Sequence, residues 1–118
     1  MTTHEIAEQL VSLCRQGKID EAQATLFAEN VVSIEAGEDM GPKVVEGLEA
    51  LQHKSKHFQE GVEEFHGATI SEPVIGGNHF AISWAMDATF KGRGRTTIEE
   101  VCVYKVADGK IISEEFFY

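Results

Sequence analysis

Basic residues are scarce in this sequence, and their scarcity limits the partners that the protein can have. The 118 residues include 10 Lys and Arg against 20 Asp and Glu, which gives a net charge of −10. A surface this acidic repels phosphate backbones, so the composition argues against a nucleic-acid partner. The basic cluster at residues 90–95 (FKGRGR) stands on a glycine-rich turn and is typical of a solvated hairpin tip.

Long apolar runs are lacking as well. None approaches the roughly 18 residues of a membrane-spanning helix, so we expect no membrane partner. The N-terminal stretch MTTHEIAEQL has neither the basic patch nor the apolar block of a secretory signal. From this we expect a cytoplasmic protein.

Cysteine is rare, and the spacing of the two cysteines carries no metal signature. Cys14 and Cys102 lie far apart, each within an apolar segment, which is typical of buried free thiols in a reducing cytoplasm. Without a CxxC pair we expect no disulfide framework and no zinc site. A GxSxG motif, a Cys-His signature, a P-loop and a dinucleotide fingerprint are also missing, so the sequence gives no reason to expect a cofactor.

The remaining composition is that of one small globular domain. Hydrophobic residues make up 42% of the chain and charged residues 25%. A chain of this length buries one hydrophobic core and is too short for two. We therefore expect a single domain over residues 1–118.

Helical periodicity dominates the first half of the chain. Ile6, Leu10 and Leu13 recur at helical spacing, and Asp20 is a suitable N-cap for a second helix. The pattern predicts, in order, a helix, a second helix, a strand, a loop and a third helix, over residues 3–15, 18–27, 31–36, 37–42 and 47–59.

The third predicted helix has an apolar stripe and a pair of histidines on opposite sides. The stripe consists of Leu48, Leu51, Ser55 and Phe58. His53 and His57 are four residues apart, which is the spacing of a helical metal pair. Because no third ligand is evident, we interpret them as surface histidines and expect no metal.

In the second half the period changes from helical to that of a strand. Residues 79–90 alternate cleanly, with one apolar set made up of Phe80, Ile82, Trp84, Met86, Ala88 and Phe90. Two further strands follow, joined by the turns KGRGR and ADGK, which predicts an antiparallel meander. Helices followed by a meander indicate an α+β fold in which three helices cover one face of a sheet.

Three segments make the chain similar to a known superfamily. They are LCRQGKIDEAQATLFAENVVSIEAG, VEGLEAL and EEVCVYKVADGKIISEEFFY. Together they resemble the nuclear transport factor 2-like (NTF2-like) superfamily, in particular its SnoaL-like branch. The resemblance implies an α+β cone, a curved antiparallel sheet packed against three helices from the N-terminal half. It also implies a pocket inside the cone and a homodimer formed through the outer sheet face.

The resemblance gives Glu35 a possible role. Strand alternation alone groups Val32, Ile34 and Ala36 as the apolar set and leaves Glu35 on the solvent side. In the alignment, however, Glu35 falls where ketosteroid isomerase carries its proton-shuttling carboxylate, inside the pocket. A carboxylate walled by apolar groups has a raised pKa and is a better base at neutral pH.

The same alignment removes the isomerase's two hydrogen-bond donors to the substrate oxygen. Leu10 and Cys102 stand at these positions, and neither donates a strong hydrogen bond. Such donors often contribute about 3 kcal/mol to catalysis, so the resemblance argues against steroid isomerisation by that mechanism.

Other polar groups have the register to enter the pocket, Glu100 as a second carboxylate and Tyr104 as a hydrogen-bond donor. The resemblance directs the set containing Glu100, Cys102 and Tyr104 inward; an exposed edge for Glu100 and simple core filling for Tyr104 remain alternatives. The facing of the last strand depends on its turn. A two-residue turn would direct the set containing Ser113, Glu115 and Phe117 inward. A bulge at Gly109, which fits the family ending better, would direct inward Ile112, Glu114, Phe116 and Tyr118.

These residues suggest a function. Two carboxylates in one apolar pocket push one pKa upward, which suits proton transfer next to a carbonyl group. Trp84, Met86, Phe58 and Phe116 would form a flat apolar bed for a cyclic ligand, unless they are simply core. The leading hypothesis is a cofactor-independent acid/base isomerase or cyclase that acts on an apolar cyclic carbonyl compound. The alternatives are a ligand binder without catalysis and a dimeric assembly module of the same fold.

Overall fold

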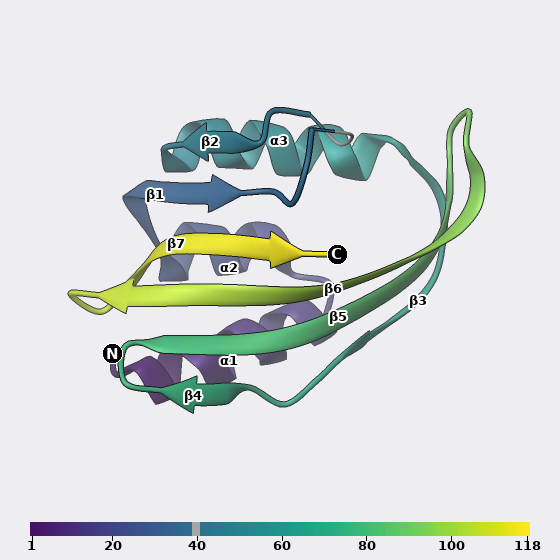
Figure 1. Ribbon diagram of the computed structural model, residues 1–118. Coiled ribbons are helices and arrows are strands. Elements are labelled where there is room, and N and C mark those ends of the chain that lie inside the picture. Colours follow the sequence, from purple (N-terminus) through teal and green to yellow (C-terminus); the bar gives the residue numbers. More distant parts are fainter. Residues whose placement is uncertain (39–40) are drawn as a thin grey trace.

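The computed structural model describes residues 1–38 and 41–118 and shows three helices and a seven-stranded sheet (Figure 1). The helices are α1 (Thr3–Arg15), α2 (Ile19–Leu26) and α3 (Leu48–Glu60). The strands are β1 (Phe27–Ile34), β2 (Val44–Glu46), β3 (Val62–Ile70), β4 (Val74–Gly76), β5 (His79–Phe90), β6 (Gly94–Ala107) and β7 (Lys110–Phe117). The predicted loop 37–42 includes Asp39 and Met40, which lie outside the described residues.

The helix α1 has the predicted bounds, and its ends explain why. Thr2 forms a capping box with Glu5, in which each side chain bonds the other residue's backbone N–H. After Arg15 the chain leaves the helix through Gly17, whose φ is +73°. One face of the helix is buried, consisting of Ile6, Ala7, Leu10, Val11 and Cys14.

The predicted N-cap of the second helix, Asp20, is wrong. Lys18 is the N-cap of α2, without a side-chain hydrogen bond, and Asp20 lies in the first turn instead. An acidic residue in the first turn still interacts favourably with the helix dipole. The strand β1 begins directly after α2 at Phe27, four residues before the predicted start at Val31.

The sheet has the order β2-β1-β7-β6-β5-β3, with β4 also paired to β5. All its pairs are antiparallel except β1 and β7, which run parallel. The predicted meander is therefore confirmed for β5, β6 and β7. Figure 1 shows α1 and α2 behind the sheet, α3 beside β1 and β2, and the long β5–β6 hairpin curling past the end of α3.

The turn before β7 differs from the favoured prediction, yet Glu114 and Phe116 face as that prediction required; the predicted inward facing of Ile112 is wrong, because Ile111 is buried in its place. Ala107 pairs with Lys110, so Asp108 and Gly109 form a two-residue turn, and both have positive φ. The register then shifts by one residue, which leaves Ile112 as the extra residue of a bulge. This shift directs Glu114 inward, opposite Tyr104.

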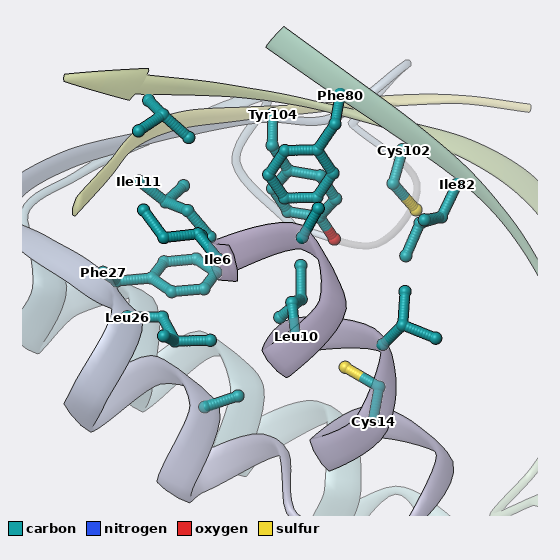
Figure 2. Close-up of a cluster of buried hydrophobic side chains, with 14 of the residues drawn as sticks. Ile6, Leu10, Cys14, Leu26, Phe27, Phe80, Ile82, Cys102, Tyr104 and Ile111 are labelled. Carbon is teal, nitrogen blue, oxygen red and sulfur yellow. The ribbon is translucent and has the colours of Figure 1, made fainter. Parts of the chain in front are cut away.

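The core lies between α1 and the concave face of the sheet (Figure 2). Its centre contains the ring of Tyr104, which stacks on Phe80 with a centroid distance of 4.9 Å and meets Phe27 edge-on. Leu10 and Cys102, the positions of the missing isomerase donors, both belong to this core. Burial raises the pKa of Tyr104 well above its ordinary value.

Within the part of the chain that the structure describes, no helix is both long enough and apolar enough to cross a membrane.

Candidate active site

Glu35 points into the protein. Along β1 and its end, Val31, Ser33 and Glu35 are buried, whereas Val32 and Ile34 are only half-buried. Glu35 is 9% exposed. The facing implied by the resemblance is therefore confirmed, and the interpretation from apolar alternation is wrong. Alternation failed here because the outer face of this strand carries Val32 and Ile34, whereas the buried face carries the polar Ser33 and Glu35.

Glu35 does not stand in a purely apolar setting, because Lys54 reaches it from α3. The Lys54 Nζ lies 2.5 Å from Glu35 Oε1, and the two side chains are 19% and 11% exposed. Sequence reasoning missed this lysine. The signal was present, since Lys54 follows Leu51 by three residues and precedes Phe58 by four, which places it on the inner face of the helix.

Glu114 is the most deeply buried carboxyl of this group. It is 5% exposed and lies beside Ser33 on the parallel neighbouring strand. The Ser33 hydroxyl donates to Glu114 Oε1 over 2.8 Å. Burial raises the pKa of Glu114 to about 7, although the Ser33 hydrogen bond and the Lys54 charge act in the opposite direction.

These contacts form one continuous polar chain, which we call the Lys54 chain. The Tyr118 hydroxyl donates to Glu35 Oε2 over 3.0 Å, and Lys54 binds the other oxygen of Glu35. Lys54 also donates to Ser33 Oγ over 3.2 Å, and Ser33 donates to Glu114. The Lys54 chain thus connects Tyr118 with α3 and the centre of the sheet.

Glu100 lies on the same concave face without an ion-pair partner among the described contacts. It is half-buried on β6, directly opposite Trp84 of β5. The Cys102 thiol donates a long hydrogen bond of 3.7 Å to Glu100 Oε1. The pKa of Glu100 is raised to about 7, mainly because the carboxyl is buried and to a smaller extent because Glu35 is negatively charged.

Exposure along β5 and β6 shows where the concave face is open to solvent. Phe80 and Ile82 are buried on β5, whereas the next two inward side chains, Trp84 and Met86, are half-buried. The concave face is therefore filled at one end of the strands and partly exposed beside Glu100. We call this partly exposed stretch, made up of Trp84, Met86, Ile98, Glu100 and Phe116, the concave opening.

The other predicted lining residues fall into different environments. Cys102 and Tyr104 face inward as predicted, and at 0% and 3% exposure both lie within the core, which for Tyr104 is the core-filling alternative. Phe58 is half-buried against Phe90, with ring centroids 5.7 Å apart. Tyr118 is 54% exposed, and its hydroxyl belongs to the Lys54 chain.

His53 and His57 are both exposed on α3, as interpreted from the sequence. Among the residues that the structure describes, no group of three or more His, Cys, Asp or Glu side chains is arranged to hold a metal ion.

Two surface hollows lie away from these carboxylates. One, of about 360 Å³, is formed around the start of α2, and the other, of about 580 Å³, lies between α2 and α3. They share Asp20 and Gln59, and most of the residues that line them are polar or charged. Neither hollow is lined by an aromatic side chain, whereas the concave opening has Trp84 and Phe116 beside Glu100.

Known proteins agree with this architecture. The family model of the SnoaL-like domain matches residues 1–118. A crystal structure of a Mesorhizobium loti protein, described both as a SnoaL-like polyketide cyclase and as a carbohydrate phosphatase, is similar over 100% of both chains, with 40% identity and a TM-score of 0.93. No functionally curated protein matches this sequence.

More distant structures share the fold alone. A Catenulispora acidiphila protein with a ketosteroid isomerase-like fold, solved with trimethylamine, has 19% identity and a TM-score of 0.75 over 99% of this chain and 87% of its own. The polyketide cyclase-like IdmH of Streptomyces antibioticus has 19% identity and a TM-score of 0.72 over 99% and 91%. The predicted NTF2-like cone is confirmed, and the chain belongs to the SnoaL-like domain family.

Proposed function

We propose that this SnoaL-like protein binds a small apolar carbonyl compound at the concave opening and moves a proton on it without a cofactor, as an isomerase or a cyclase does. The observation that carries the proposal is Glu100. It is a carboxylate without an ion-pair partner among the described contacts, it lies opposite Trp84, and its pKa is raised to about 7. A base of this kind is matched to proton transfer at neutral pH.

Glu100 is a better proton acceptor than Glu35, to which the sequence directed attention. Both oxygens of Glu35 already accept hydrogen bonds, one from Lys54 and one from Tyr118. In the proposed reaction Glu100 removes a proton from the carbon next to the carbonyl group and returns it at another carbon. Glu35 positions Lys54, and its negative charge helps to keep the pKa of Glu100 high.

The apolar side chains of the concave opening suit a flat, cyclic ligand. Trp84 and Phe116 pack against the core and still have exposed surface, and Met86 lies one step further along β5. Aromatic and thioether side chains provide contact area with few polar demands. The description of the Mesorhizobium loti relative as a polyketide cyclase supports a cyclic carbonyl compound as the substrate class.

The test begins with binding and continues with proton exchange. Sterols, aromatic polyketides and simple cyclic ketones are screened by thermal shift against the purified protein. Each ketone that raises Tm is incubated in D₂O with and without the protein, and deuterium at the carbon next to the carbonyl is followed by NMR. We expect faster exchange with the protein. Binding without accelerated exchange would reject catalysis and favour a ligand binder.

A homodimer through the outer sheet face is the second part of the proposal. An apolar row crosses the sheet on this face, formed by Val44, Ile34, Val103, Ala81 and Val74 and interrupted by Glu115. Val101 and Phe117 lie beside it and are 45% and 49% exposed. A second copy of the chain would present the same apolar row, which is the requirement of a symmetric interface.

The cytoplasmic location expected from the sequence stays a prediction.

A further inference from the structure

Lys54 is a cation held at the concave face, and the reaction described above gives it no chemical role. Its Nζ lies 2.5 Å from Glu35 Oε1, 3.2 Å from Ser33 Oγ and 5.5 Å from the centre of the Phe116 ring. An ammonium group has three N–H donors. Among the residues described, the structure gives hydrogen-bonding partners to two of them, Glu35 and Ser33.

Holding α3 against the sheet does not by itself require a lysine at this position. Removing an ammonium group from water is costly, and an apolar side chain can pack a helix onto a sheet without that cost. The charge of Lys54 also acts beyond its ion pair, because it lowers the pKa of both Glu100 and Glu114. Lys54 therefore lies where its charge acts on the proposed base as well as on Glu35.

We propose that Lys54 donates a hydrogen bond to the oxygen of a carbonyl compound bound at the concave opening and stabilises the negative charge that forms there. The inference rests on the proposed function, since it concerns the same site. As Glu100 takes the proton, the C–H bond breaks and its electron pair moves into the carbonyl group, which becomes an enolate. Lys54 binds the enolate oxygen until Glu100 returns the proton, so no oxidant, reductant or cofactor takes part.

In this role Lys54 supplies the hydrogen-bond donor to the substrate oxygen that the sequence lacks at the two isomerase positions. Leu10 and Cys102 cannot donate to a substrate oxygen, and both are buried in the core. Lys54 comes from α3 and places its ammonium group beside the partly exposed Phe116 ring, at the concave opening. A positive donor next to an aromatic bed fits ligands that are apolar and carry one oxygen able to become negative, namely enolisable ketones and phenols.

Binding of 2-naphthol tests the inference without any turnover. Its neutral and ionised forms differ in fluorescence, so its protonation in the complex can be followed as the pH is varied. Naphthalene has the same ring system without the oxygen and reports on the apolar bed alone. We expect the wild type to bind ionised naphthol about tenfold to a hundredfold more tightly than the neutral form, as one hydrogen bond from a charged donor predicts.

Variants then assign this preference to Lys54. Lys54→Met should abolish it and leave naphthalene binding unchanged, whereas Lys54→Arg should keep most of it. Lys56→Met is the matched control, because Lys56 is exposed on the same helix and its loss changes the net charge equally. The double variant Glu35→Gln/Lys54→Met removes the carboxylate left without its partner, and it should lack the preference as well.

The possible failures are distinguishable. If neither naphthalene nor naphthol binds the wild type, the concave opening is not a ligand site, and the proposed function falls together with the inference. If naphthalene binds but the wild type does not prefer ionised naphthol, only the role of Lys54 is rejected. The same holds if Lys54→Met retains the preference, or if the double variant regains it.

Discussion

Glu114 shows how one buried carboxyl makes the stability of the folded protein depend on pH. Its pKa is raised from 4.5 to about 7, so the folded protein holds this proton more tightly than the unfolded chain does. The stabilising contribution is complete below the unfolded pKa of 4.5 and is lost as the pH rises through about 7. The shift corresponds to a loss on the order of 3 kcal/mol.

Glu114→Gln should reduce this dependence on pH. Gln keeps an oxygen that can accept the Ser33 hydrogen bond but has no proton to lose. Urea unfolding at pH about 5 and about 8 should show a smaller fall in the free energy of unfolding for the variant than for the wild type. Glu115→Gln, one residue further along and directed outward, is the control. Equal pH dependence in wild type and Glu114→Gln would contradict the raised pKa.

Glu35 and Lys54 show what can and cannot be predicted from the sequence about single residues. The inward facing of Glu35 was predictable only from the resemblance, because the outer face of β1 is the more apolar of the two. The partner Lys54 lies 19 positions further along the chain, and its contact with Glu35 is a product of how α3 packs on β1. Spacing showed which face of the helix Lys54 occupies, but not which strand that face would meet.

The turn before β7 is the element on which the inward facing of Glu114 depends. Asp108 and Gly109 both have positive φ, at 51° and 73°. A Cβ at Gly109 would also lie 3.3 Å from the Met1 backbone nitrogen. Gly109→Ala should therefore destabilise the protein by about 1–2 kcal/mol.

Chemical unfolding of Gly109→Ala beside Gly76→Ala measures the effect of the turn. Gly76 has an ordinary φ, and a Cβ there would meet no atom within 4 Å. A destabilisation that is equal in the two variants would show that the positive φ at the turn is not the cause.

This hairpin also shows why the prediction of facing was right for the wrong reason. The favoured prediction put a bulge at Gly109, whereas the structure has the alternative two-residue turn. A bulge at Ile112 then restores the inward facing of Glu114 and Phe116. The bulge lies within the segment IISEE, where no glycine or proline marks it in the sequence.

At the level of the whole molecule, the fold was far more predictable than the site. Periodicity was enough to find the helices and the long strands, because each buries one face against a single core. The parallel pairing of β1 with β7 was not predictable from periodicity, since it joins segments from opposite ends of the chain. The Lys54 chain spans this same pairing, through Ser33 and Glu114, so its geometry could not be predicted either.

The proposed dimer predicts a mass of twice 13.0 kDa in solution. Val101→Lys would place a charge beside the apolar row of the outer face and should shift the protein toward monomer. Phe65→Lys is the control, since Phe65 is 60% exposed and pairs with Ala88 of the inward set. Light scattering after size exclusion measures the masses. A monomeric wild type, or a Val101→Lys variant that stays dimeric, would contradict an interface on this face.

The central claim is that Glu100 is the base of a proton-transfer site, and deuterium exchange tests it most directly. Glu100→Gln removes the base, while Glu99→Gln changes its exposed neighbour on the outer face. For a cyclic ketone that binds both variants, we expect Glu100→Gln to lower the exchange rate about 100-fold or more, and Glu99→Gln to leave it near that of the wild type. Equal exchange rates in the wild type and Glu100→Gln would contradict the claim.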